Sequence, residues 1–186
     1  MNPIKNKKDL AETIDKIRDL AYSYIEKYSP SKQQLKIYLF KKLVKTEQKR
    51  TSKKEIFDLI DTLITTLIDQ KLLNDKYYSD AKSKAFYRRG YSLNKIRYNL
   101  VKKGIDHKYI KASISKIKED ESDPDFFSAI KLCKRRRIGP NREESNRILF
   151  YKKDISILAR SGFSYEISKK VLEIPKDEFL KFCKMI

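Results

Sequence analysis

Apolar residues recur at steps of three and four along almost the whole chain, which is the spacing of one face of an α-helix. The first stretch has Leu10, Ile14, Ile17, Ala21, Tyr24 and Tyr28. The second has Leu35, Leu39 and Leu43, and the third has Ile56, Leu59, Ile60, Leu63 and Leu67. Later stretches follow the same period, with Tyr78, Ala81, Ala85 and Phe86 in one of them. The pattern predicts an all-α protein without strands.

Residues that begin and end helices separate these stretches. Ser31 with Gln34 and Ser52 with Glu55 have the spacing of a capping box, in which each side chain bonds to the backbone N–H of the other residue. Further N-caps are predicted at Ser92, Asp123 (before Pro124) and Ser164. We also expect Asn141, with Glu144, to begin a helix whose inner face includes Ile148 and Tyr151. Glycines 90, 104, 139 and 162 follow predicted helices, where the left-handed C′ position favours Gly.

These signals group the helices into three units of three: residues 1–73, 74–121 and 122–186, the last with a C-terminal extension. The segment LVKKGIDHKYIKASI at 100–114 aligns with LARSGFSYEISKKVL at 158–172, which supports a repeated unit. A three-helix unit of about 45 residues has a marginal core by itself, so neighbouring units have to share apolar surface. We therefore expect three tandem three-helix repeats in an elongated molecule.

The charge of the chain indicates a polyanionic partner, which the helical pattern alone does not. The chain has 44 Lys and Arg against 25 Asp and Glu, a net charge of +19. Residues 77–118 contain 12 of the basic residues and only 2 acidic ones, so more than half of the net charge lies in 42 residues. A uniform preference for Lys would not produce this concentration. We interpret the middle segment as an electrostatic surface.

Two sets of basic side chains are candidates for contact with the partner or with DNA. The middle set lies off the apolar faces of two predicted helices that meet at Gly90: Lys82, Arg88, Arg89, Lys95, Arg97, Lys102 and Lys103. The second set lies at the end of the helix that follows Pro124: Lys131, Lys134, Arg135, Arg136 and Arg137. For the second set, compensation of the helix dipole is an equally good explanation. Of the 12 tyrosines, we expect Tyr87, Tyr91 and Tyr98 to be exposed and able to stack on unpaired bases.

The sequence contains no arrangement of residues that is typical of a catalytic site. The 4 glycines lie too far apart for a phosphate-binding loop, and His107 is the single His, which excludes multi-His metal sites. We predict no enzyme activity, no metal and no cofactor. Cys133 and Cys183 lie on apolar helix faces, as core thiols do. With no apolar signal segment and no apolar run of about 18 residues, we expect a reduced, cytoplasmic protein without a membrane span.

From about Ile17 to Ile174 the chain resembles the RecX family, regulators of the RecA recombinase. One part of the resemblance is carried by Leu72-Leu73-Asn74-Asp75, Tyr78, Ala81, Phe86, Arg89-Gly90, Ile96, Leu100 and Lys103-Gly104-Ile105. The other part is carried by Leu158-Ala159-Arg160, Gly162-Phe163-Ser164-Tyr165 and Ile167. The chain departs from the family pattern at Asn74, in the loop from Lys45 to Thr51 and in an insertion-like stretch from Arg142 to Phe150.

The resemblance implies a curved monomer that binds the groove of RecA–single-stranded-DNA filaments. Family members inhibit ATP hydrolysis and strand exchange and have no active site of their own. Two alternatives stay open: a helix-turn-helix DNA-binding protein with residues 92–103 as recognition helix, and a helical-repeat adaptor that binds proteins only. Phe86 speaks against the first, because that motif favours Ala four residues before Gly90. The sequence also leaves open whether the basic residues meet DNA phosphates or acidic residues of RecA.

Overall fold

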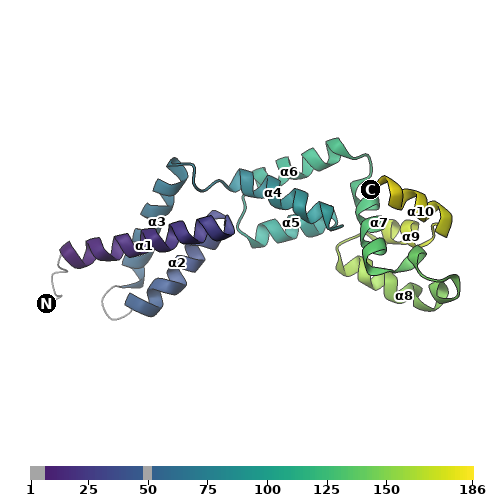
Figure 1. Ribbon diagram of the computed structural model, residues 1–186, viewed down its shortest axis with the longest axis horizontal. Helices are drawn as coiled ribbons and strands as arrows, with labels where there is room; N and C mark the ends of the chain where they lie inside the picture. Colours follow the sequence, from purple (N-terminus) through teal and green to yellow (C-terminus); the bar gives the residue numbers. More distant parts are fainter. Residues whose placement is uncertain (1–6, 48–51) are drawn as a thin grey trace. The chain divides into compact units, whose positions relative to one another are not determined.

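Every regular element of the structure is helical, in a computed structural model that describes residues 7–47 and 52–186 (Figure 1). The first six helices are α1 (Lys7–Tyr28), α2 (Lys32–Glu47), α3 (Lys53–Asp69), α4 (Asp75–Arg88), α5 (Leu93–Lys102) and α6 (His107–Asp120). They are followed by α7 (Pro124–Arg136), the 3₁₀ turn η1 (Gly139–Asn141), α8 (Glu144–Arg160), α9 (Tyr165–Leu172) and α10 (Lys176–Met185). The all-α prediction is confirmed, whereas the division into three repeats stays a prediction. Within the described residues, no helix combines the length and the apolar character that crossing a membrane requires.

Contacts divide the chain into two compact units. The first unit holds the described residues up to Tyr78 together with Lys103–Ile105, and the second holds Ser79–Lys102 and Asp106–Ile186. Both units are built from amphipathic helices whose apolar stripes face inward.

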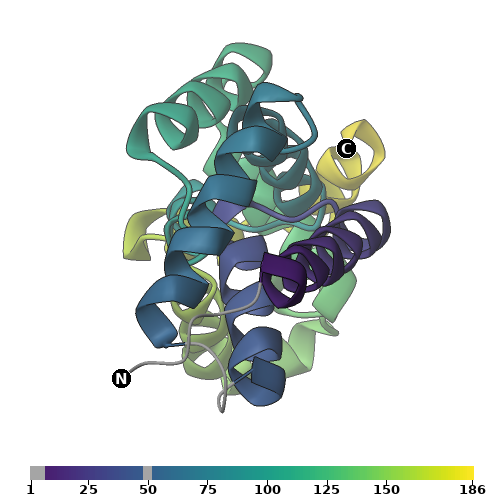
Figure 2. The same ribbon diagram turned by 90° about the vertical axis from the view of Figure 1, so that its left-hand side faces the viewer.

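The first unit contains the α1–α3 bundle, in which α1 lies beside α2 and α3 (Figures 1 and 2). Its buried core consists of Ile17, Ala21, Leu35, Leu39, Leu43, Ile56, Ile60, Ile64, Leu67 and Leu73. Both predicted capping boxes are present: the backbone N–H of Gln34 donates to Ser31 Oγ at 3.3 Å, and that of Glu55 donates to Ser52 Oγ at 3.3 Å. The Ser31 hydroxyl also donates to the carbonyl of Lys103 at 2.7 Å. This bond connects the segment Lys103–Ile105 to the start of α2.

The second unit has its main core where α7, α8, α9 and α10 meet. The buried members include Phe126, Ile130, Leu158, Val171 and Phe179. Both cysteines are free and buried in this core, so the prediction of core thiols is confirmed. Burial raises the pKa of the Cys133 thiol to about 12, with smaller contributions from the negative charges of Asp154 and Cys183.

Three expectations about single residues are wrong. Ala81 is exposed on α4 rather than packed inward. Ile148 is 90 % exposed, although it continues the apolar stripe of α8. Asn141 does not begin α8, because Gly139–Asn141 form a 3₁₀ turn and the helix begins at Glu144 after an N-cap without a side-chain bond. At Ala81 and Ile148 the spacing fits the apolar face of a helix, but the side chains are exposed instead of packed.

Candidate functional site

The turn between α4 and α5 lies directly on the backbone of α7. Gly90 has φ +74° there, and a Cβ atom on it would lie 2.9 Å from the carbonyl oxygen of Ser128 and 3.0 Å from the nitrogen of Leu132. Only Gly combines a left-handed backbone with so close an approach. This turn therefore brings the middle basic set, on α4 and α5, next to the second basic set on α7.

Three hydrogen bonds hold this arrangement. Arg135 Nη1 donates to the carbonyl of Arg89 at 2.6 Å, which connects the end of α7 to the end of α4. The N–H of Leu93, the first residue of α5, donates to Asp125 Oδ1 at 2.7 Å. Burial raises the pKa of Asp125, an effect that the Leu93 N–H partly offsets.

The third bond connects α5 to the end of α8. Ser92 Oγ donates to the carbonyl of Ser161 at 2.9 Å while it accepts from the N–H of Lys95 at 3.1 Å. Ser92 is thus the predicted N-cap of α5 and, at the same time, a contact with the turn after α8. The predicted cap is confirmed, and its second role could not be seen in the sequence.

A pocket of about 330 Å³ opens where α5, α7 and α8 meet. Its cationic lining residues are Lys95, Arg135, Arg136 and Arg160. Its other lining residues are Tyr91, Leu132, Ile157 and Ser161. We call it the basic pocket. It joins one residue of the middle set, Lys95, to two residues of the second set that lie 40 positions further along the chain.

Arg160 is the cationic residue of the basic pocket that sequence reasoning did not include among the site residues. It stands two residues before Gly162, as Lys102 stands two residues before Gly104, in the two segments that align with each other. The correspondence between these two helix ends was the signal that could have identified it.

The remaining predicted residues divide into two groups by what their side chains contact. Lys134 Nζ donates to the carbonyl of Cys183 at 2.9 Å, so it complements the C-terminal turn of α10. The Lys131 ammonium lies 4.3 Å from the centre of the Tyr87 ring, and burial lowers the pKa of Lys131. Arg137 ends α7 in a left-handed conformation with φ +53°. Lys131 and Lys134 thus make contacts within the second unit, and none of the three residues lines the basic pocket.

Most of the other predicted residues are exposed and lie at helix ends or on the outer face of α5. Lys82 and Lys95 are half-buried, while Arg88, Arg89, Arg97, Lys102 and Lys103 are exposed. Lys103 follows α5 directly but belongs to the first unit, where its carbonyl accepts from Ser31.

Most of the predicted cationic residues form no ion pair with a carboxylate among the described residues. Elsewhere in the described residues, lysines and arginines form ion pairs, as Lys116 does with Asp80 and Lys170 with Asp123. Within the same described ranges, eleven predicted residues form no ion pair: Arg88, Arg89, Lys95, Arg97, Lys102, Lys103, Lys131, Lys134, Arg135, Arg136 and Arg137. Uncompensated charge of one sign is what attracts a polyanion.

One of the three tyrosines singled out from the sequence is exposed. Tyr98 is 57 % exposed on α5, and the ammonium groups of Lys95 and Lys102 lie 5.4 Å and 5.9 Å from its ring centre. Tyr91 is half-buried and stacks on Phe86 with ring centres 5.3 Å apart. Tyr87 is half-buried, its hydroxyl is buried, and burial raises its pKa to about 12. The expectation of exposure is therefore confirmed for Tyr98 and wrong for the other two.

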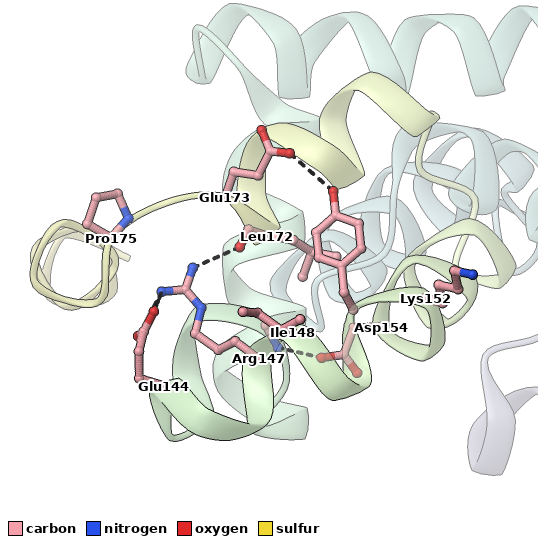
Figure 3. A pocket seen from close by; sticks show the side chains of 10 residues that line it. Glu144, Arg147, Ile148, Lys152, Asp154, Leu172, Glu173 and Pro175 are labelled. Atoms are coloured by element: carbon pink, nitrogen blue, oxygen red, sulfur yellow. Dashed lines mark hydrogen bonds and ion pairs between the residues drawn. The ribbon is translucent and has the colours of Figure 1, made fainter.

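A second pocket, of about 620 Å³, lies between α8 and the ends of α9 and η1 (Figure 3). Several of its polar side chains form hydrogen bonds within the lining. Arg147 donates to Glu144 Oε2 at 3.1 Å and to the carbonyl of Leu172 at 2.9 Å, and Tyr151 donates to Glu173 at 3.3 Å. What this pocket offers a partner is apolar surface, continued at its rim by the exposed Ile148 (Figure 3).

Neither pocket has the residues of a metal centre. In the part of the chain that the structure describes, no group of three or more His, Cys, Asp or Glu side chains could hold a metal ion. The functional candidates are therefore a cationic pocket with an aromatic neighbour and a mainly apolar pocket, both suited to binding.

Comparison with known proteins shows which proteins this chain is similar to. No family model matches the chain. It is 27 % identical to Regulatory protein RecX of Myxococcus xanthus over 84 % of each chain, and 26 % identical to Regulatory protein RecX of Clostridium perfringens over 75 % of this chain and 66 % of that one. The crystal structure of RecX from Lactobacillus salivarius has the same fold, with a TM-score of 0.59 and 20 % identity over 95 % of this chain and 99 % of that one. In sequence the chain is similar to proteins named Regulatory protein RecX, and it shares the fold of the solved RecX structure.

Proposed function

We propose that this chain regulates the RecA recombinase by binding RecA–single-stranded-DNA filaments, where it suppresses ATP hydrolysis and strand exchange. The observation that carries the proposal is the relationship to Regulatory protein RecX of Myxococcus xanthus along 84 % of both chains. The protein acts as a monomer without an active site, metal or cofactor of its own.

The basic residues of the second unit that form no ion pair support a filament as the partner. A nucleoprotein filament contains a continuous polyanion, and cationic side chains that neutralise phosphates bind it by releasing counterions. Long-range attraction of a chain with net charge +19 also accelerates its encounter with such a partner.

A separate observation supports a contact with protein as well as with DNA. Ile148 is 90 % exposed and Leu149 is 75 % exposed, next to each other on α8. Ile148 lines the larger pocket, and large aliphatic side chains exposed near such a pocket are typical of protein–protein contacts. A RecA filament offers both kinds of surface, which a naked DNA duplex does not.

The two alternatives lead to different partners. A helix-turn-helix protein with α5 as recognition helix would bind duplex DNA tightly without RecA. A purely protein-binding adaptor would bind with little dependence on salt. The family relationship favours a regulator over both, and measurements of binding to duplex, single strand and filament separate the three.

The direct test is the rate of RecA-catalysed ATP hydrolysis on single-stranded DNA, measured across a titration with the full chain. We expect the rate to fall as the protein approaches the concentration of RecA or below it, and strand exchange to slow with it. The chain alone should hydrolyse no ATP. An unchanged RecA rate across the whole titration would contradict the proposal.

A further inference from the structure

We infer that the basic pocket binds one nucleotide of a single-stranded nucleic acid, with the phosphate held by its cationic side chains and the base against its apolar floor. The inference rests on the proposed function for its setting and deepens it, because it names the component of the filament that this surface contacts. The contact itself can be measured without RecA.

The lining of the pocket selects an anion. It includes Lys95, Arg135, Arg136 and Arg160, and no carboxylate is among the lining residues. These four positive charges surround a pocket of about 330 Å³, and they repel one another when no anion is bound. Three of the four are guanidinium groups, whose planar fork matches two oxygens of a phosphate at once.

Two of these guanidinium groups are already oriented by the main chain. Arg135 uses Nη1 to bond the carbonyl of Arg89, and Arg160 uses Nε to bond the carbonyl of Ser156 at 3.2 Å. A guanidinium has five N–H donors, so most donors of each remain free for a ligand. Side chains that are held before binding lose less conformational entropy when the ligand arrives.

The size and the floor of the pocket favour a nucleotide over a carboxylate side chain. Leu132 and Ile157 contribute apolar surface, and the Tyr91 ring, fixed by its stack on Phe86, contributes an aromatic wall. A pocket of about 330 Å³ is in the range that accepts small organic ligands. A single Asp or Glu would leave the apolar floor uncovered and most of the guanidinium donors without a partner.

The surroundings of the pocket favour an unpaired strand over a duplex. Lys95 lines the pocket and also lies 5.4 Å from the ring centre of the exposed Tyr98. A base that follows the bound nucleotide can stack on Tyr98, because aromatic platforms beside cationic grooves bind single strands without regard to sequence. A base inside a duplex is paired and stacked, so it would have to be extruded before it could enter.

The test is binding of a fluorescently labelled single strand of about 16 nucleotides, followed by anisotropy with the full chain. The pocket variant is Arg136→Gln with Arg160→Gln. Its matched control is Lys169→Gln with Lys184→Gln, two exposed residues of the same unit that lie outside the pocket and change the net charge equally. Thermal unfolding of both variants checks that they are folded, as their exposed positions lead us to expect.

We expect the pocket variant to lose about tenfold or more in affinity and the control to stay within about twofold of the wild type. The slope of log affinity against log salt should become shallower by about 0.7 in the pocket variant alone, since the contact with one phosphate is lost. Equal losses in both variants would overturn the inference, because they would show a general effect of net charge.

Two further ligands test the nucleotide itself. A strand of equal length with abasic sites should bind more weakly than the intact strand, and polyglutamate of equal length should bind weakly to wild type and pocket variant alike. Abasic binding equal to that of the intact strand, or polyglutamate binding that the pocket variant selectively loses, would overturn the assignment of a nucleotide.

The outcomes for the two proposals are distinguishable. If the wild type binds no single strand but slows RecA, the inference fails and the proposed function stands. If it binds the strand through the pocket but leaves RecA unchanged, the proposed function fails and the pocket assignment stands.

Discussion

Arg142 holds the carboxylate of Asp154 through two parallel hydrogen bonds, from Nε to Oδ2 at 2.8 Å and from Nη2 to Oδ1 at 2.9 Å. Asp154 is 1 % exposed, and its Oδ2 also accepts from the N–H of Gly139 at 2.8 Å. The bonds to Asp154 raise the pKa of the Arg142 guanidinium, which therefore stays charged. One buried carboxylate thus connects α8 to the 3₁₀ turn after α7.

Replacing Arg142 by Met should lower the free energy of unfolding by about 3–5 kcal/mol, because it leaves the Asp154 charge buried without its partner. Chemical denaturation measures the loss. Arg18→Met is the matched control, since the pair of Arg18 with Asp15 is exposed and should contribute within about 1 kcal/mol. The double replacement Arg142→Met with Asp154→Leu should recover part of the stability. Equal small losses for Arg142→Met and Arg18→Met would contradict a structural role of the buried pair.

Reversing four exposed charges should weaken binding to the RecA–DNA filament without unfolding the protein. The variant combines Arg88→Glu, Arg89→Glu, Lys102→Glu and Lys103→Glu, all at exposed positions where a change costs within about 0.5 kcal/mol each. Co-sedimentation with filaments at several salt concentrations measures binding. A shallower salt slope in the variant indicates contact with phosphates. Filament binding like that of the wild type would show that these charges do not contribute.

Gly90→Ala should destabilise the protein by more than its backbone strain alone. Gly90 has φ +74°, so the substitution costs about 1–2 kcal/mol of left-handed strain. The new Cβ would also lie 2.9 Å and 3.0 Å from backbone atoms of α7, which adds about 1–3 kcal/mol of overpacking. Chemical denaturation measures the loss in the free energy of unfolding. A loss no larger than the strain would mean that the turn does not pack closely on α7.

Neither thiol should react with a thiol reagent in the native protein at the rate of a free cysteine. Because burial raises the pKa of Cys133 to about 12, its thiolate fraction near pH 8 is lower than that of a free thiol by a factor on the order of a thousand. Cys183→Ala leaves Cys133 as the single reporter, and labelling kinetics with and without denaturant measure its protection. Fast labelling of the folded variant would place Cys133 outside the core.

Polar replacement of two exposed aliphatic residues should separate protein contact from DNA contact. Ile148→Ser with Leu149→Ser should leave the unfolding temperature nearly unchanged, since the side chains are 90 % and 75 % exposed. We expect it to weaken the effect on RecA ATP hydrolysis and to leave binding of a single strand unchanged. Weaker binding of the single strand, or an effect on RecA ATP hydrolysis equal to that of the wild type, would contradict a protein contact at Ile148 and Leu149.

The helical elements could be predicted because the interactions that define them are local. The N-caps Ser31, Ser52, Ser92, Asp123 and Ser164 each accept a backbone N–H of the helix that follows, as their positions in the sequence indicated. The left-handed glycines at helix ends follow from steric rules for single residues. Such interactions span four residues or fewer, so a single sequence contains all of their participants.

Burial of individual positions was less predictable, because it depends on which element packs against a helix. Ile148 and Leu158 both fit the apolar stripe of α8, yet one is exposed and the other is fully buried. Asp154 is buried in the same helix at a position that its polarity assigns to the surface. Its burial is stabilised by Arg142 and Gly139, whose contact with it depends on the path of the chain through η1.

The sequence by itself determined the helical class, most helix ends and the similarity to RecX proteins, since periodicity, caps and the order of motifs are properties of the chain alone. It also identified most of the cationic residues of the site. Only the tertiary structure decided that Lys95, Arg135 and Arg160 share one pocket while Lys134 turns to the end of α10. The physical reason is that charge is a property of each residue, whereas a pocket depends on packing contacts between helices that lie tens of residues apart.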